Sequence, residues 1–426
     1  MKRFALFALS LYAVATLISM AVMNLAFGVV LISFVMMAIQ KKKLSFALAL
    51  RLSEFHRYRF WGLLLGSACI LSLILAQYFP FAYAGHNPDI TFHGYEKIWY
   101  LTASAVLLSV FISSEGNEKS FRTIIQAWGY TVLALAPLAV IQFFTGWPVD
   151  QRIFNGNFHH AILLLGHHLS VASILVFPTF VYLTLSSGRI KRQEKLSLFE
   201  VAVGGAGILI LFLSFARTAW LSLFIGLGLL SFRYLSKKQR FIATAGILVL
   251  CSGLLFVKEI RYKILQSDGI GQRVELWKAN IDFFEHRPLT GIGWLKTQEM
   301  SEFYFKNKDP EHYHDYFWGH AHSNIFEMLG GTGLLGFLTW LGWVYFTLTL
   351  AYRSAKVAHD QNRFFLADLS WGIFVALILL HFNGLTNVTF WEAKVIHQQM
   401  LGVGMLLMIQ WMLVTQPAPK KPQRIQ

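Results

Sequence analysis

The sequence predicts an all-α polytopic membrane protein of about twelve transmembrane helices. Of its 426 residues 55% are hydrophobic and only 14% are charged, and the mean hydropathy is +0.51. Soluble domains carry about 25% charged residues. Apolar runs close to the ~20 residues that cross a bilayer core recur from end to end. Because the bilayer offers no water to backbone amides, runs of this length predict helices rather than β-barrel strands.

The apolar runs divide into twelve predicted spans. The first two form one run that is too long for a single crossing, and Asn24 marks a tight turn between them. Lys2 and Arg3 precede this run and lysines 41–43 follow it, which is consistent with a hairpin. The predicted spans are 4–22, 25–40, 60–79, 97–114, 123–144, 161–185, 197–213, 218–232, 241–257, 327–351, 365–382 and 397–414.

The basic residues predict the orientation of these spans. On the inner side fall 24 of the 37 lysines and arginines, and nine of the 13 on the outer side lie in one long loop, 258–322. Short loops follow the positive-inside rule and long loops are exempt from it, so both termini are predicted to be cytoplasmic. The net charge of +15 therefore indicates topology, and we expect no nucleic-acid partner.

The loop 258–322 is the one extramembrane segment large enough to fold, and it lies between the ninth and tenth spans of a single predicted transmembrane domain, 1–426. Helical spacing of apolar residues predicts an amphipathic helix over 273–284, which could lie on the membrane surface. Pro288 is expected to stop it, and the segment 291–294 (GIGW) to form a turn. The apolar stripe of this helix is Val274, Trp277, Ile281 and Phe284.

Arg217 is the first candidate site residue. It lies in the segment 214–220 (SFARTAW), at the outer mouth of the hairpin formed by spans seven and eight. A charge at the membrane edge is costly and marks function by default, and an arginine fork suits bidentate binding of phosphate. The alternative is an arginine that snorkels to lipid phosphates.

A second candidate is the segment 319–324 (GHAHSN), which leads into span ten. A histidine at the membrane surface titrates near neutral pH, as a general base must. The alternative is an interfacial histidine above a packed helix start. Glu327 follows His322 by five residues and could orient a partner, or simply snorkel. Glycines 330, 331, 333 and 336 then allow close helix packing or close approach of another backbone.

The basic residues of the long loop form a third set. Solvation is the usual fate of loop charges, but Arg273 opens the predicted helix and Arg287 precedes the segment 288–291 (PLTG), so one of them could face the membrane. Lys278 and Lys296 complete the set.

The histidines predict no metal site. Zinc could be built from His312, His314, His320 and His322, but no HExxH motif or paired cysteines support it. Cys69 and Cys251 both fall in apolar runs. The pairs 159–160 and 167–168, at the outer end of span six, could line a cavity or belong to the core.

These motifs resemble the O-antigen ligase and Wzy-type polymerase superfamily, which handles lipid-linked bacterial glycans. The match is closest to the ligase pattern, in which a histidine is followed by Asn, Ser or Gln, nine residues, Gly, two residues and then Gly or a similar residue. Here these positions are His322, Ser323, Gly333 and Gly336. Asn often follows the histidine, but the pattern permits Ser. Arg217 is similar to the membrane-edge arginine of the family, and segments 273–277 (RVELW) and 288–294 (PLTGIGW) resemble its long-loop segments.

The resemblance implies a glycosyltransferase C-like fold and a metal-independent, cofactor-free glycosyltransferase of the bacterial inner membrane, with a periplasmic active site. The implied donor is a glycan on undecaprenyl pyrophosphate, and for a ligase the acceptor is an outer core sugar of lipid A-core. Membrane lipids would surround both. The implied catalytic residues are His322 as base with Arg217 and Arg273 on the phosphates. We add as substrate-binding residues Arg287, His320, Asn324 and Glu327.

Three other functions remain open from the sequence. A Wzy-type polymerase uses the same donor and acts on a second lipid-linked glycan, and a relative that glycosylates proteins often carries extra C-terminal regions. A transporter or flippase for an anionic or lipidic solute would also fit basic outer groups and apolar helices. The sequence shows neither the inverted repeats nor the matched polar breaks at mid-membrane that would support a transporter.

Overall fold

The computed structural model describes residues 2–40, 52–78, 96–150, 158–254, 256, 261 and 268–416, and all the secondary-structure elements in them are helices. The elements are α1 (Lys2–Ala15), α2 (Met20–Gln40), α4 (Ser53–Tyr78), α5 (Glu96–Ser113), α6 (Glu118–Thr145), α7 (His168–Lys191), α8 (Leu198–Leu213), α9 (Arg217–Tyr234), α10 (Lys237–Leu254), α12 (Asp268–His286), α13 (Thr297–Lys308), the 3₁₀ turn η1 (Tyr313–Asp315), α14 (Asn324–Asp360), α15 (Phe364–Asn383) and α16 (Ala393–Thr415).

The prediction of an all-α polytopic membrane protein is confirmed. Each predicted span overlaps one of these helices. In the described part of the chain, seven helices are long and apolar enough to cross a membrane, and shorter apolar helices accompany them. The number of twelve crossings stays a prediction. The start of the long loop, 258–267, lies outside the described residues apart from Arg261, as do Met1 and residues 417–426.

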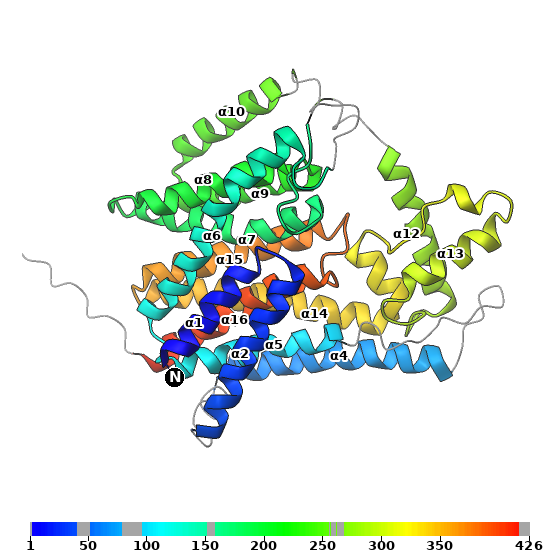
Figure 1. The fold of residues 1–426 in the computed structure, drawn as a ribbon, viewed down its shortest axis with the longest axis horizontal. Helices are drawn as coiled ribbons and strands as arrows, with labels where there is room; N and C mark the ends of the chain where they lie inside the picture. Colours follow the sequence, from blue (N-terminus) through cyan, green and yellow to red (C-terminus); the bar gives the residue numbers. More distant parts are fainter. Residues whose placement is uncertain are drawn as a thin grey trace, which may run out of the picture.

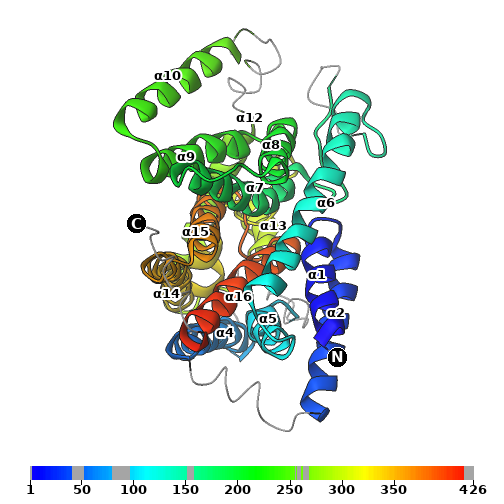
Figure 2. The ribbon, with the colours of Figure 1, turned by 90° about the vertical axis from the view of Figure 1, so that its left-hand side faces the viewer.

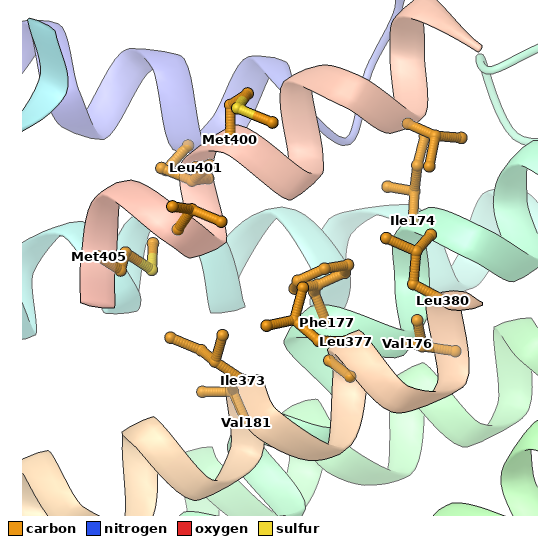
Figure 3. Packing of buried hydrophobic residues seen from close by; sticks show 14 of the residues in the cluster. Ile174, Val176, Phe177, Val181, Ile373, Leu377, Leu380, Met400, Leu401 and Met405 are labelled. Atoms are coloured by element: carbon orange, nitrogen blue, oxygen red, sulfur yellow. The ribbon is translucent and has the colours of Figure 1, made fainter. Parts of the chain in front are cut away.

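The centre of the bundle is built from α7, α15 and α16. Viewed along the bundle, these helices lie in the middle, with α8 and α9 on one side and α4 and α5 on the other (Figure 2). Both α7 and α16 are buried over 83% of their most apolar stretch, as expected of helices that are apolar all round. Phe177, Leu377 and Leu401 interdigitate between the three helices (Figure 3). A Cβ added at Gly372 would lie 2.6 Å from Val181 Cα, so α7 and α15 touch through their backbones.

The predicted turn at Asn24 is wrong. The break between α1 and α2 lies at residues 16–19 instead. Ser19 Oγ accepts a hydrogen bond from Val22 N (3.4 Å), and Thr16 Oγ1 donates to Ala13 O (2.7 Å). Hydroxyls that compete with the helical ladder therefore end α1, and hydropathy does not detect them. Asn24 lies inside α2, where its Oδ1 is 3.1 Å from His397 Nε2.

The sixth predicted span also starts too early, because residues 158–167 are not helical and α7 begins at His168. This segment folds back against the ends of α6 and α8. The buried amide of Gln142 accepts a hydrogen bond from Leu163 N (2.7 Å) and donates to Leu163 O (2.9 Å). One glutamine thus satisfies backbone groups that a helix would have paired, which is why an apolar sequence here need not be helical.

The long loop forms its own small core and packs on the start of α14. The predicted amphipathic helix is confirmed as α12, which ends at His286, two residues before Pro288. The face that it buries is not the predicted stripe but the neighbouring one, with Leu276, Ala279 and Phe283 packed against α13. Figure 1 shows α12 and α13 together at one end of the bundle.

A break in α14 joins this loop to the bundle. Gly333 has φ 62° and ψ −164°, so the helical ladder is interrupted there. The segment 288–293 fills the gap and takes over the backbone groups that lose their helical partners. Four hydrogen bonds join them: Ile292 N to Gly330 O (3.0 Å), Gly293 N to Gly331 O (3.0 Å), Leu334 N to Pro288 O (2.8 Å) and Leu335 N to Leu289 O (3.2 Å). Gly291, Gly331 and Gly333 are therefore explained by one close backbone contact, which fixes the end of α12.

Gly333→Ala is expected to lower the thermal unfolding temperature of the detergent-solubilised protein. Alanine at this φ is strained by about 1–3 kcal/mol, and its Cβ would lie 2.4 Å from the Leu289 carbonyl carbon. Gly228→Ala in α9, where an added Cβ meets no atom within 4 Å, is the matched control. It should be neutral or stabilising by up to about 1 kcal/mol. Equal unfolding temperatures for the two variants would contradict this account of the break.

Candidate active site

The predicted catalytic residues gather at the end of the bundle where α7, α9, α14 and α16 begin, which we call the site end. Arg217 is the first residue of α9, Arg273 lies in α12, and His322 precedes α14. The charge of Arg217 acts on Arg273, and the charge of Arg273 acts on His322. Residues separated by about a hundred positions in the sequence thus form one electrostatic cluster.

His322 is held in an unusual environment. Its φ of 47° lies in the left-handed region, which non-glycine residues adopt at a cost and which often marks functional sites. Burial, together with the charges of His320, Arg273 and His167, lowers the pKa of His322 to about 3, while a side-chain hydrogen bond with Asn387 opposes the shift. The imidazole is therefore neutral at pH 7, the form that accepts a proton.

His320 lies directly beside His322. The two ring centroids are 4.2 Å apart, and His320 Nδ1 accepts a hydrogen bond from His322 N (3.2 Å). This bond holds the backbone of His322 in its left-handed conformation. The predicted role of His320 in substrate binding stays a prediction, and the geometry adds a role in positioning His322.

The side chains of Glu327 and Asn324 form hydrogen bonds with other groups of the protein. Glu327 is buried, and its two carboxylate oxygens accept hydrogen bonds from Thr297 Oγ1 (2.5 Å) and from Ala321 N (2.8 Å), next to His322. Asn324 Oδ1 accepts from Thr389 N (2.9 Å), and its amide donates to Thr389 Oγ1 (2.9 Å). We predicted both as substrate-binding residues, and these contacts favour positioning roles instead.

Glu327→Gln is expected to lower kcat about tenfold or more and to lower the unfolding temperature. The glutamine amide nitrogen cannot accept a hydrogen bond, so either Thr297 or Ala321 loses its acceptor, and a lost charge-assisted hydrogen bond costs about 1.5–3 kcal/mol. Glu302→Gln, on the α13 pair with Lys306 (2.7 Å), is the control. An unchanged kcat in the Glu327→Gln protein would contradict a positioning role for Glu327.

Arg273 is an uncompensated cation. Within the described ranges it is half-buried and forms no hydrogen bond or ion pair. Burial lowers the pKa of Arg273, and the neighbouring charge of Arg217 lowers it further. Two like charges brought together and partly removed from water raise the free energy of the folded protein. An arrangement of this kind is stabilised when an anion binds between the guanidinium groups.

The position of Arg217 is set by the segment before α9. Phe215 has φ 54°, which turns the chain sharply into the helix. His160 Nδ1 donates a hydrogen bond to Ser214 O (2.8 Å), and Ala161 N donates to Leu213 O (3.0 Å). Of the two uses considered for the pair 159–160, His160 therefore serves the packing that orients Arg217.

Arg287 follows the end of α12 and contacts α4. Its Nη1 donates to Leu75 O near the end of α4 (3.4 Å), and burial lowers the pKa of its guanidinium. This contact anchors the segment after α12 to α4. Contact of Arg287 with a substrate stays a prediction.

Two residues at the site were not predicted, Asn387 and Lys394, and His167 was considered only as part of a pair that could line a cavity or belong to the core. His167 is the N-cap of α7, and its pKa is lowered by burial and by the charges of Lys394 and His320. Lys394 begins α16 and donates a hydrogen bond from Nζ to Leu165 O. Lys394 is one of few basic residues in the short outer loops, and this signal could have found it. Asn387 has no sequence signal that we can identify.

The described residues contain no group of three or more His, Cys, Asp or Glu side chains that could hold a metal ion. The four histidines considered for a zinc site have other contacts, and His314 packs against the ring of Tyr313. His312 pairs with Asp309 (3.2 Å), while His320 and His322 belong to the cluster above.

Part of the chain matches a known protein family. Residues 202–341 match the family model described as O-antigen ligase, and a search of curated proteins gives no match. The matched segment holds every site residue predicted from the sequence, whereas His167, Asn387 and Lys394 lie outside it. The family supports a multi-pass membrane protein that ligates or polymerises glycans. The match over residues 202–341 therefore agrees with the resemblance of the chain to the O-antigen ligase and Wzy-type polymerase superfamily.

Proposed function

We propose that this protein is a glycosyltransferase of the O-antigen ligase type. It transfers a glycan from undecaprenyl pyrophosphate to an acceptor sugar of lipid A-core at the periplasmic face of the bacterial inner membrane. The observation that carries the proposal is the neutral His322 beside the coupled cations Arg273 and Arg217. The proposed reaction needs no metal and no cofactor.

The arginines act on the donor. The periplasm contains no ATP, so the donor must bring its own leaving group, and a lipid pyrophosphate does so. When the bond between the anomeric carbon and the phosphate oxygen breaks, negative charge develops on that oxygen. Fixed cations aimed at developing charge stabilise the transition state without reorganisation. Arg217 and Arg273 are suited to this because they are partly buried and close together.

His322 acts on the acceptor. Its neutral imidazole removes the proton from the acceptor hydroxyl as the oxygen attacks the anomeric carbon. One bond forms as the other breaks, and undecaprenyl pyrophosphate leaves with the electron pair. A single displacement of this kind inverts the configuration at the anomeric carbon. His320, Glu327 and Asn387 support the reaction through the position of His322.

The proposed topology agrees with the position of the site. With both termini cytoplasmic, the starts of α7, α9, α14 and α16 lie on the outer side, together with α12 and α13. A polyprenyl chain would then lie between helices, with its pyrophosphate at the membrane surface next to α12. The surface charges support this assignment through the positive-inside rule.

Transfer by purified protein in detergent tests the proposal. The assay supplies a defined glycan on undecaprenyl pyrophosphate and purified lipid A-core, and we expect the glycan on the core lipid with release of undecaprenyl pyrophosphate. Transfer without a membrane gradient would exclude a transporter. A Wzy-type polymerase would instead extend the lipid-linked glycan when two donors are supplied. A cell without the gene distinguishes the same two enzymes, because loss of a ligase leaves polymer on the lipid carrier and loss of a polymerase leaves single units on the core.

A further inference from the structure

A pocket of about 450 Å³ lies at the end of the bundle opposite the site end. Because α7 and α9 both begin at the site end, their last residues lie at this opposite end, where α10 begins. The pocket opens between these three helix ends. It is lined by Ser187, Ile190, Lys191, Gln193, Arg233, Tyr234, Leu235, Ser236 and Gln239.

The lining of this pocket contains two cations and no carboxylate. The cations are Lys191, in the last turn of α7, and Arg233, in the last turn of α9. In the described part of the chain, no aspartate or glutamate forms an ion pair with either of them. The Nε atom of Arg233 is buried and has no hydrogen-bond partner among the same residues. Cations without a carboxylate partner are common binding groups for phosphate.

A second pocket at the same end of the bundle shows the opposite arrangement. It has a volume of about 500 Å³ and is lined by other residues near the end of α7, including Arg189 and Arg192. Arg189 pairs with Glu200 (2.7 Å), and Arg192 pairs with Asp368 (2.7 Å). The other oxygen of Asp368 accepts a hydrogen bond from Tyr234 Oη (2.8 Å). These arginines are thus neutralised within the protein, whereas the two cations of the first pocket are not.

Contacts with the protein hold both cations of the first pocket in place. Lys191 Nζ donates a hydrogen bond to Arg233 O (2.9 Å), at the end of α9. The guanidinium carbon of Arg233 lies over the ring of Trp371, 4.5 Å from its centroid. Gln239 Oε1 accepts from Ser236 N (2.9 Å), so the amide nitrogen of Gln239 is the atom left to bind a ligand. Groups fixed in this way lose less conformational entropy when a ligand binds.

The position of the pocket along the helices favours a lipid over a soluble anion. Its lining residues fall in 187–193 and 233–239, immediately outside the predicted ends of spans six and eight and the predicted start of span nine. The headgroups of a bilayer lie at this level. Apolar side chains flank the cations, since Ile190 is 55% exposed and Phe232 is 74% exposed. A lipid would cover these side chains with its acyl chains, which a soluble phosphate cannot do.

We propose that Arg233 and Lys191 bind the phosphate of an anionic phospholipid, with its acyl chains against Ile190 and Phe232. The arginine offers a planar fork of donors to the phosphate oxygens, and the lysine offers a point charge. With both termini cytoplasmic, this lipid belongs to the inner leaflet, where basic pockets between helices bind anionic headgroups. The site lies at the end of the bundle opposite the catalytic candidates, and the inference does not depend on the proposed transfer reaction.

Native mass spectrometry of the full chain in a neutral detergent tests the site. The probes are phosphatidylglycerol and phosphatidylcholine with identical acyl chains. The dissociation constant of the first bound phosphatidylglycerol is expected to be about tenfold lower, because the choline cation of the other lipid meets two fixed cations. Lys191→Met and Arg233→Met should each raise the constant for phosphatidylglycerol about tenfold, the effect of one lost charge-assisted hydrogen bond. Neither should change the constant for phosphatidylcholine.

Two control variants separate binding from folding. Lys191→Arg keeps the charge and a donor for Arg233 O, so it should bind phosphatidylglycerol as the wild type does. Lys119→Met removes an exposed lysine of α6 at the same end of the bundle and should change neither constant. Lys191 is itself exposed, so Lys191→Met decides the question even where Arg233→Met does not fold.

Three results would overturn the proposal. The first is equal affinity of the wild type for both lipids, and the second is unchanged binding of phosphatidylglycerol in the folded methionine variants. The third comes from thermal unfolding, because a ligand of the folded state raises the unfolding temperature. A rise with inorganic phosphate alone that is lost in Lys191→Met would assign the pocket to a soluble anion instead of a lipid.

Discussion

His322→Ala is expected to reduce transfer by about 10²–10⁴, the usual contribution of a positioned general base. The imidazole is buried beside Arg273, and these surroundings lower its pKa to about 3, so it is neutral and able to accept a proton throughout the physiological range. Alanine leaves no group there to accept the proton of the acceptor hydroxyl. The measurement is kcat for glycan transfer by purified protein with saturating donor and acceptor.

The pH dependence of kcat/KM for the wild-type protein is a second test of His322 as the base. With a pKa of about 3 in the free protein, His322 stays unprotonated as pH falls from 8 to 5, so kcat/KM should not decline through loss of the base. A histidine with an ordinary pKa of about 6.5 would become protonated in that range, and kcat/KM would fall. His312→Ala, at an exposed histidine of the same loop, is the matched control and should keep wild-type rates. Full activity of a folded His322→Ala protein would remove the proposed base.

Arg273→Met is expected to lower kcat by about 10²–10³, because it removes one fixed cation from the developing charge on the phosphate. At the same time the unfolding temperature should stay the same or rise. The guanidinium is half-buried next to Arg217 and has no partner in the described parts of the chain, so its charge destabilises the free protein. Methionine keeps most of the stem that packs in the loop. Kinetics and thermal unfolding in detergent measure the two effects.

If Arg273 only stabilised the fold, Arg273→Met would instead lower the unfolding temperature and have a smaller effect on kcat. Arg353→Ala is the control, since Arg353 pairs with Glu54 (3.6 Å) at the opposite end of the bundle and should affect neither quantity strongly. The double variant of Arg273 and Arg217 should lose less than the product of the two single losses if both bind the same diphosphate. Strictly multiplicative losses would argue for two separate roles.

Hydropathy and loop charge predicted most of the fold, because each span must be apolar over a bilayer thickness. They failed where single polar side chains decide the backbone. Ser19 and Thr16 end α1 within an apolar run, and Gln142 holds the apolar segment 158–167 outside α7. The glycine pattern from 330 to 336 allowed either close helix packing or close backbone approach, but it did not predict that segment 288–293 would replace part of the helical ladder.

The candidate site could be predicted only where its residues fall in a motif. His322, Arg217 and Arg273 lie in segments with a recognisable pattern, and all fall between residues 202 and 341. Asn387 and Lys394 reach the site from the turn before α16 and from its first turn, and His167 from the start of α7. Only the packing of α7, α15 and α16 brings them together, and no local pattern encodes it. For Glu327 and Asn324 the observed contacts favour positioning roles, which spacing could not indicate because it cannot distinguish a side chain facing a ligand from one facing its own backbone.

The central claim is that Arg217, Arg273 and His322 act on one bound donor. The most direct measurement is an electron cryomicroscopy structure of the protein with bound undecaprenyl pyrophosphate. Our account predicts the diphosphate between the two guanidinium groups, within hydrogen-bond distance of both, with the His322 imidazole facing the terminal phosphate where the sugar would be attached. A diphosphate bound elsewhere on the bundle, with these three side chains unchanged and free of it, would contradict the account.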